Sequence, residues 1–294
     1  MKDEYMLTKR NKAILFILCS AFFFALMNTF VRLAGDLPSV QKSFFRNLVA
    51  LGAALVLLLR SEEKLRWDRA HLPVFLLRSA FGTMGVLCNF YAVDHLLLSD
   101  ASMLNKLSPF FAILFSRLAL KERIKPFQIL GILAAFGGML LIVKPGFASA
   151  ALFPSLVGVL GGMSAGAAYT AVRWLGQKGE RGPFIVFFFS TFSCVATLPF
   201  LILDYHPMSL YQLAMLLCAG LCAAFAQFAV TAAYTNAPAR TISVYDYSQV
   251  VFSAVLGFVL FSQIPDLWSV LGYCIICGVS VLMFLYGKKA EPAA

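Results

Sequence analysis

The chain is dominated by long, uninterrupted blocks of apolar residues. Each block is about twenty residues long, the length that an α-helix needs to cross a hydrocarbon core roughly 30 Å thick. Inside lipid, every backbone N–H and C=O group must be satisfied within its own segment, so such blocks fold as helices. A membrane β-barrel would show short segments of alternating polarity rather than runs such as Ala53–Leu59. We therefore expect an all-α polytopic membrane protein.

The overall composition excludes several other classes of protein. Of the 294 residues, 61% are hydrophobic and only 13% are charged, about half the charged fraction of a typical soluble domain. The seven cysteines fall in apolar segments, and none is spaced with histidine as a metal site would require. We expect no metal and no cofactor.

Ten apolar segments can be delimited, and the basic residues between them predict their orientation. The segments are Lys12–Ala34, Val40–Leu59, Leu72–Ala92, Leu96–Leu120, Pro126–Val143, Ala150–Leu175, Pro183–Leu203, Leu210–Thr235, Thr241–Phe261 and Leu267–Tyr286. If the N-terminus is inside, lysine and arginine accumulate in the inner connections, whereas the outer ones contain only Lys42 and Lys144. The positive-inside rule then predicts ten transmembrane helices with both termini cytoplasmic. The net charge of +10 is therefore a topology signal, and no nucleic-acid partner is expected.

A weak internal repeat relates the two halves of the chain. An offset of 141 residues brings together one arginine pair and three glycine pairs: Arg32 with Arg173, Gly35 with Gly176, Gly131 with Gly272 and Gly137 with Gly278. Residues 1–145 and 146–294 thus form two five-helix repeats, and an odd number of spans inverts the second. Inverted repeats are typical of secondary transporters, in which two similar halves exchange roles around a central site. Duplication retained for packing alone is the alternative.

Two stretches resemble a known family. Leu104–Ile113, with Pro109 near its centre, and Leu120–Arg123, followed by Gln128–Gly131 and Gly137–Gly138, resemble the fourth and fifth helices of EamA-type proteins. These are the ten-helix branch of the drug/metabolite transporter (DMT) superfamily. The second half departs from the pattern, with Gln263 in place of Glu122.

The resemblance implies a bacterial inner-membrane transporter of amino acids, nucleobases, sugars, cofactors, quaternary amines or drugs. It also implies a cavity lined by the first, third, fourth, sixth, eighth and ninth helices.

A lysine and an aspartate fall deep inside predicted helices. Lys106 lies about ten residues, or roughly 15 Å, into the fourth segment, too deep to reach the headgroups comfortably. The repeat pairs Asn105 with Asp246 and Lys106 with Tyr247. Charges at this depth are costly and hence functional candidates. Lys106 and Asp246 either bind the carboxylate and ammonium of a zwitterion or neutralise each other, and the sequence leaves both open.

Five arginines also fall within apolar segments. Arg32, Arg117 and Arg173 lie near segment ends, where their side chains can reach the headgroups. Arg46 and Arg78 lie about two turns inside, and either structural pairing or a gate fits them.

Further polar side chains are expected to face the same cavity if helical phase is kept. They are Asn28, Asn89, Tyr91, Ser102, Asn105, Tyr169, Gln227, Tyr234, Tyr245, Tyr247 and Gln249. Amides and tyrosines at depth either orient a substrate or form hydrogen bonds between helices. The stripe Gly158, Gly162 and Gly166 favours close helix packing.

Together these features predict a secondary transporter that works by alternating access. An amino acid or related zwitterion is the favoured substrate, and organic cations, quaternary amines or drugs are the alternative. A channel or a membrane enzyme is a remote alternative, since the three histidines lie in loops or at helix ends. Asp246 is a candidate proton carrier, and we expect a monomer or a weak homodimer in the lipid bilayer.

Overall fold

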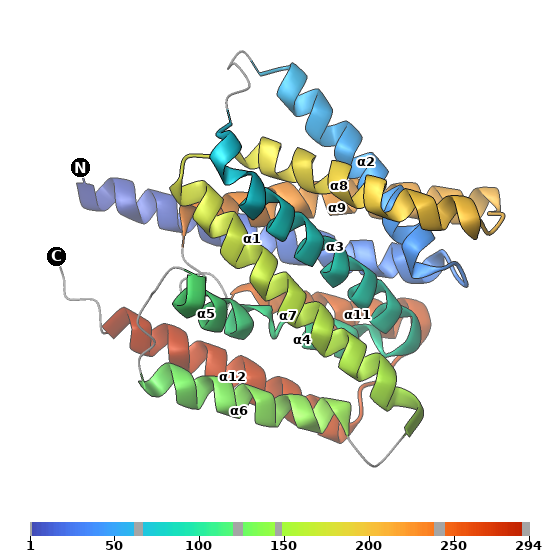
Figure 1. Cartoon of the computed structure of the whole chain (residues 1–294). Helices are drawn as coiled ribbons and strands as arrows, with labels where there is room; N and C mark the ends of the chain where they lie inside the picture. Colours follow the sequence, from blue (N-terminus) through green and yellow to red (C-terminus); the bar gives the residue numbers. More distant parts are fainter. Residues whose placement is uncertain (1, 62–66, 120–125, 145–148, 238–244, 290–294) are drawn as a thin grey trace.

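The computed structural model describes residues 2–61, 67–119, 126–144, 149–237 and 245–289, and every regular element in these ranges is helical (Figure 1). In chain order the elements are α1 (Lys2–Leu33), α2 (Ser39–Leu59), the 3-10 helix η1 (Arg69–His71), α3 (Leu72–His95), α4 (Leu98–Asn105), α5 (Ser108–Ala119), α6 (Pro126–Val143), α7 (Ser149–Gln177), α8 (Gly182–Leu203), α9 (Leu210–Asn236), α11 (Ser248–Phe261) and α12 (Leu267–Lys289).

Six of these helices are long and apolar enough to cross a membrane, namely those containing Lys12–Leu33, Ser39–Leu59, Arg69–His95, Ala151–Gln177, Gly182–Leu203 and Leu210–Asn236. Shorter apolar stretches occupy Ile129–Val143, Ser248–Phe261 and Leu267–Met283. Many large apolar side chains point outward, among them Leu59 and Leu203, where lipid replaces water around them. The architecture is therefore all-helical and membrane-embedded, and the count of ten spans stays a prediction.

Most predicted segments coincide with observed helices. α6 begins and ends at the predicted residues, and α2 begins one residue earlier than predicted. The predicted segment Thr241–Phe261 begins outside the described residues, and its described part forms α11 after a turn at Tyr247.

The predicted single helix Leu96–Leu120 is wrong, because the chain breaks it into α4 and α5. The cause is Pro109, which has no N–H to donate to the carbonyl of Asn105 and whose ring would collide with that carbonyl in a continuous helix. Lys106 and Leu107 form the turn, closed by a 3.2 Å hydrogen bond from the N–H of Leu107 to the carbonyl of Leu104. The turn at Tyr247 lies 141 residues after Lys106, so both halves interrupt a helix at equivalent positions.

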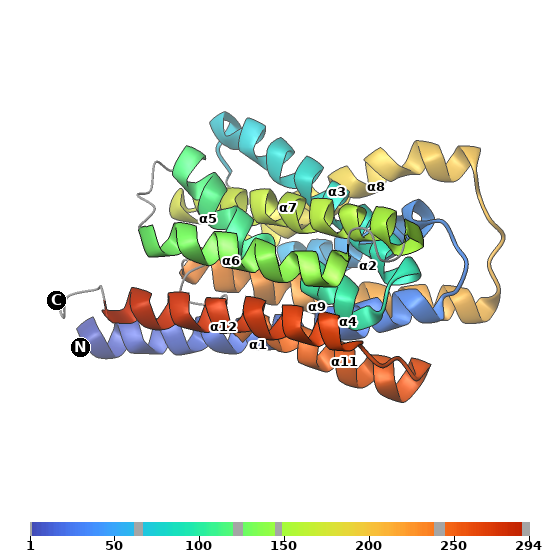
Figure 2. The same ribbon diagram turned by 90° about the horizontal axis from the view of Figure 1, so that it is seen from below.

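The packed pairs of helices come in matching sets. By the offset of 141 residues, α7, α9 and α11 correspond to α1, α3 and α5. The contact of α1 with α9 therefore has its equivalent in the contact of α7 with α3, and the contact of α5 with α7 has its equivalent in that of α11 with α1. Two further pairs join each helix to its own counterpart, α2 with α8 and α6 with α12, and α4 packs on α11. Figures 1 and 2 show α6 and α12 side by side, and also show the start of α1 and the end of α12 at the same end of the molecule.

The glycine stripe of α7 packs against the broken helix. A Cβ at Gly162 would lie 2.5 Å from the carbonyl oxygen of Leu104, and one at Gly166 would lie 2.7 Å from that of Ser108. Only glycine allows the backbone to approach this closely. The stripe therefore holds the α4–α5 turn against α7, which is the packing role predicted for it.

An ion pair joins α6 to α12 at one end of the molecule. The Nζ of Lys144 lies 2.6 Å from Oδ2 of Asp266, whose other oxygen accepts a hydrogen bond from the N–H of Ser269 in the first turn of α12. Burial alone would raise the pKa of Asp266, but these hydrogen bonds hold that pKa below its ordinary value.

Candidate functional site

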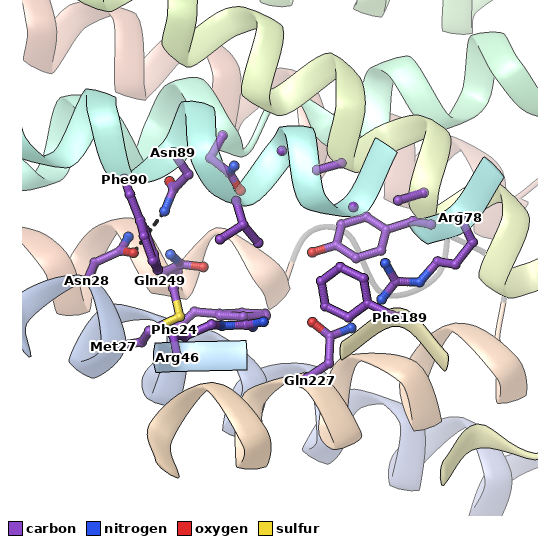
Figure 3. Close-up of a pocket in the computed structure, with 17 residues that line it drawn as sticks. Phe24, Met27, Asn28, Arg46, Arg78, Asn89, Phe90, Phe189, Gln227 and Gln249 are labelled. Atoms are coloured by element: carbon purple, nitrogen blue, oxygen red, sulfur yellow. Dashed lines mark hydrogen bonds between the residues drawn. The ribbon is translucent and has the colours of Figure 1, made fainter. Parts of the chain in front are cut away.

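A pocket lies at the centre of the bundle, between the two halves of the chain. Its volume is about 60 Å³, smaller than the range of about 300–1,000 Å³ that is usual for small-molecule sites. Seventeen residues line it: Phe24, Met27, Asn28, Arg46, Arg78, Gly82, Gly85, Val86, Asn89, Phe90, Asn105, Ala165, Ala168, Tyr169, Phe189, Gln227 and Gln249 (Figure 3). They come from α1, α2, α3 and α4 in the first half and from α7, α8, α9 and α11 in the second.

Six of the predicted polar residues line this pocket: Asn28, Asn89, Asn105, Tyr169, Gln227 and Gln249. The Nδ2 of Asn89 donates a 2.9 Å hydrogen bond to Oδ1 of Asn28, which joins α3 to α1. Figure 3 shows Asn28, Asn89 and Gln249 gathered at one end of the pocket and Gln227 toward the other. The amides are thus spread along the pocket, where they can orient polar groups at several points.

Arg46 and Arg78 also line the pocket, and both are almost fully buried, at 1% and 2% exposure. The guanidinium carbon of Arg78 lies 4.1 Å from the centre of the Phe189 ring, and that of Arg46 lies 5.8 Å from the same ring. Among the described residues, no carboxylate lies within ion-pair distance of either arginine. Neither arginine is therefore paired with an acid among the described residues, and a gate role stays a prediction.

Neighbouring residues position the two arginines. Nη1 of Arg46 donates to Oδ1 of Asn47, whose Nδ2 donates to Oγ of Ser193 at 2.8 Å. This chain ties α2 to α8. Gly82, one turn after Arg78 on α3, leaves room for the arginine to fold back, since a Cβ there would overlap both Nη1 of Arg78 and the Phe189 ring.

Lys106 and Asp246 lie together but outside the pocket lining. The Nζ of Lys106 is 2.7 Å from Oδ1 of Asp246, and the two side chains are 2% and 1% exposed. The hydroxyl of Tyr247 donates to the carbonyl of Lys106 at 2.9 Å. The geometry favours mutual neutralisation, one of the two alternatives that the sequence left open, and a direct substrate role for the pair stays a prediction.

The remaining predicted residues lie beside the pocket rather than in its lining. Ser102 exchanges a 2.7 Å hydrogen bond with Ser253, and Tyr91 stacks on the ring of His95. Tyr234 stacks on the pocket residue Tyr169 at 4.7 Å between ring centres. Tyr245 accepts a hydrogen bond from Oγ of Ser248 at its carbonyl. The Ser102–Ser253 and Tyr234–Tyr169 contacts join helices, which is the commoner role of such residues in membranes, whereas the other two contacts are local.

The apolar wall of the pocket was not predicted. It consists of Phe24, Met27, Val86, Phe90 and Phe189. In a chain with 29 phenylalanines, no spacing distinguishes those that face a pocket from those that face lipid. The resemblance implied no lining by α2 or α8, although Arg46 of α2 was a candidate gate residue.

Two basic residues near one end of the bundle make contacts that were not predicted. Lys42 is not in an outer connection but in the first turn of α2, buried, with Nζ 2.7 Å from Oδ1 of Asp94. Arg32, which was expected to reach the headgroups, also donates to the carbonyls of Val93 and Leu96, at 3.0 and 2.6 Å. The last carbonyl oxygens of a helix have no hydrogen-bond donor within it, and the Arg32 guanidinium donates to two such oxygens at the end of α3.

Metal ligands are not gathered anywhere in the described ranges: no group of three or more His, Cys, Asp or Glu side chains is placed to hold an ion.

The fold and the central pocket define a multi-pass membrane protein with a pocket between its two halves. The chain belongs to the EamA-like transporter family, whose model matches it twice, at residues 11–144 and 152–285. The two matches begin 141 residues apart, the same offset as the internal repeat. The family places the chain among the transporters of the drug/metabolite superfamily.

Relatives of known function are also transporters. The chain is 33% identical to the pseudopaline exporter CntI of Pseudomonas aeruginosa over 268 residues, covering 90% of this chain and 93% of that protein. It is 27% identical to a riboflavin transporter of Brucella anthropi, covering 90% and 95%. A solved crystal structure matches 95% of this chain with a TM-score of 0.73 at 15% identity, a likeness of fold alone.

Proposed function

We propose that the protein is a secondary transporter that carries a small polar metabolite across the bacterial inner membrane by alternating access. Its two inverted five-helix repeats, residues 1–145 and 146–294, would rock around the central pocket, with both termini cytoplasmic. The observation that carries the proposal is a pocket lined by polar side chains from both halves of the chain. The matching sets of packed helices and the two family matches support the repeat.

The pocket chemistry favours a metabolite with several hydrogen-bonding groups. Six amide or phenol side chains and two guanidiniums face the space, and such groups orient polar substrates and supply specificity. An amino acid or related zwitterion fits this lining. Organic cations, the second candidate, are favoured by the aromatic rings Phe24, Phe90 and Phe189, but two buried arginines repel them.

Proteoliposomes loaded with a filtered bacterial cell extract test this function whatever the cargo is. We expect mass spectrometry to show a few small polar compounds leaving faster than from protein-free vesicles. Isotope-labelled forms of those compounds should then accumulate by counterflow, which a channel does not support. If no compound leaves faster, the transport proposal fails.

Two matched variants show whether the compounds pass through the pocket. Val86→Trp places a large ring in the pocket, whereas Val255→Trp places the same ring on the exposed face of α11. We expect loss of the compounds to stop in the first variant and to continue in the second. Equal loss in both would mean that the pocket is not the path.

A further inference from the structure

The charges around the pocket do not balance. Arg46 and Arg78 are the charged residues in its lining, and arginine stays protonated in proteins. Asp246, a buried acid on the element before α11, is already bonded to Lys106 at 2.7 Å. The pocket therefore carries two positive charges that the described side chains leave uncompensated. Buried charges are normally paired, so a ligand of opposite charge would satisfy them.

The two guanidiniums are held in a way that leaves hydrogen-bonding atoms free. Both lie over one ring, that of Phe189, at 4.1 and 5.8 Å from its centre, and the Nε atoms of both are buried without a hydrogen-bond partner. Ring contact fixes the plane of a guanidinium without using its N–H groups. A guanidinium with a fixed plane and free N–H groups is suited to a carboxylate, which accepts two parallel hydrogen bonds.

The other lining residues indicate the chemistry of the part of the ligand that is not a carboxylate. Phe24, Val86, Phe90 and Phe189 supply a flat apolar wall. Asn28, whose Nδ2 is buried without a partner, lies toward the end opposite Arg78 (Figure 3). A molecule that fills this space carries its acid groups toward the arginines and has an apolar core.

We propose that Arg46 and Arg78 form an anion site, and that the protein takes small organic acids with two carboxylates on a compact apolar body. This inference rests on the proposed transport function and narrows its substrate class. It assigns recognition of the carboxylates to α2 and α3 rather than to the Lys106–Asp246 pair.

Four ring compounds of similar size and different charge test the site. Isophthalate has two carboxylates, benzoate has one, benzamide is neutral and benzyltrimethylammonium is a cation. Their binding to the purified full-length protein is measured as concentration-dependent thermal stabilisation in detergent. We expect isophthalate to bind most tightly, benzoate less tightly and benzamide weakly, with no stabilisation by the cation. Equal binding of isophthalate and benzamide, or no stabilisation by isophthalate at any concentration, would overturn the proposal.

Variants connect that order of binding to the two arginines. Arg46→Gln and Arg78→Gln should each weaken isophthalate binding by about tenfold or more, since a charge-assisted pair is lost. Arg78→Lys keeps the positive charge but lacks the two parallel N–H donors of a guanidinium, so it should bind isophthalate more tightly than Arg78→Gln and less tightly than the wild type. This intermediate affinity also shows that weak binding by Arg78→Gln is not caused by a folding defect. Arg60→Gln, which removes an exposed arginine beyond the end of α2, is the control and should bind as the wild type does.

Unchanged isophthalate binding in both glutamine variants would contradict the proposed anion site. The proteoliposome experiment separates this failure from a failure of transport. If the exchanged compounds are cations or neutral, the protein is a transporter and the anion site is wrong. If nothing is exchanged, the transport proposal itself fails.

Discussion

The hydroxyl of Tyr247 donates a 2.9 Å hydrogen bond to the backbone carbonyl of Lys106, and each of these residues lies in the turn that interrupts its own helix. The two positions are 141 residues apart, so the contact joins equivalent points of the two halves. The carbonyl of Lys106 is at a helix end, where backbone oxygens lack intrahelical partners. Tyr247 therefore stabilises the break that Pro109 imposes.

Tyr247→Phe should destabilise the protein, because the ring stays while the hydroxyl loses its hydrogen bond to Lys106 and its contact with Ser280. The expected cost is about 1 kcal/mol, measured as a lower Tm of the purified protein in detergent. Tyr91→Phe is the matched control, since Tyr91 contacts the described residues through its ring and its backbone carbonyl. A Tm of Tyr247→Phe equal to that of the control would show that the carbonyl finds another donor.

Lys106→Met should cost more than Tyr247→Phe, because it leaves the carboxylate of Asp246 buried and unpaired. Breaking a buried ion pair from one side typically costs about 3–5 kcal/mol. Replacing both partners, as Lys106→Met with Asp246→Leu, should restore most of the Tm, since neither charge then remains. A double variant as unstable as the single one would contradict a simple ion-pair role.

The same double variant also tests whether the pair touches the cargo. Exchange of metabolites in proteoliposomes should persist if Lys106 and Asp246 only neutralise each other. Complete loss of exchange at wild-type stability would support the zwitterion-binding role that the sequence suggests.

Gly162→Ala should lower the Tm, because its methyl group would lie 2.5 Å from the carbonyl oxygen of Leu104. Overpacking of this kind costs about 1–3 kcal/mol. Gly52→Ala on α2 is the control, since nothing lies within 4 Å of a Cβ at that position. An alanine in an open helical position should raise the Tm slightly. Equal Tm values for both variants would mean that α4 and α7 can separate without cost.

Gly82→Ala should weaken isophthalate binding more than it lowers the Tm. The added methyl group overlaps Nη1 of Arg78 and the edge of the Phe189 ring, so the flexible end of the arginine must move. We expect binding to fall by about tenfold, the effect of misplacing one guanidinium. Gly278→Ala, with open space at its Cβ, should bind as the wild type does. Unchanged binding in Gly82→Ala would show that Arg78 need not lie on Phe189.

The helices were predictable because hydropathy and helix length are local properties. Their ends agree within a few residues, except at the start of α1, which lies ten residues before the predicted Lys12, and at the turn at Lys106, which divides the predicted fourth segment. Pro109 was visible in the sequence, but prolines are often tolerated within membrane helices. The break follows from a backbone clash that hydropathy does not report.

The pocket was predictable only in part. Asn28, Asn89, Gln227 and Gln249 were identified because amides are rare in apolar helices. Phe189 was not, because its role depends on two arginines from other helices meeting over one ring. Lys42 was misplaced for a similar reason: its partner Asp94 is distant in the sequence, and a charge near a helix end resembles a loop residue until that partner is known.

In the proposed transport cycle, the two arginines would determine how a membrane voltage acts on the pocket. An empty pocket that moves between the two sides carries two positive charges with it, whereas a pocket holding a dianion moves as a neutral unit. A potential of 100 mV changes the free energy of each elementary charge that crosses the membrane by about 2.3 kcal/mol. In the proposed cycle, the voltage would therefore act on the return of the empty carrier rather than on the passage of the cargo, and the direction of the potential would favour one orientation of the empty pocket.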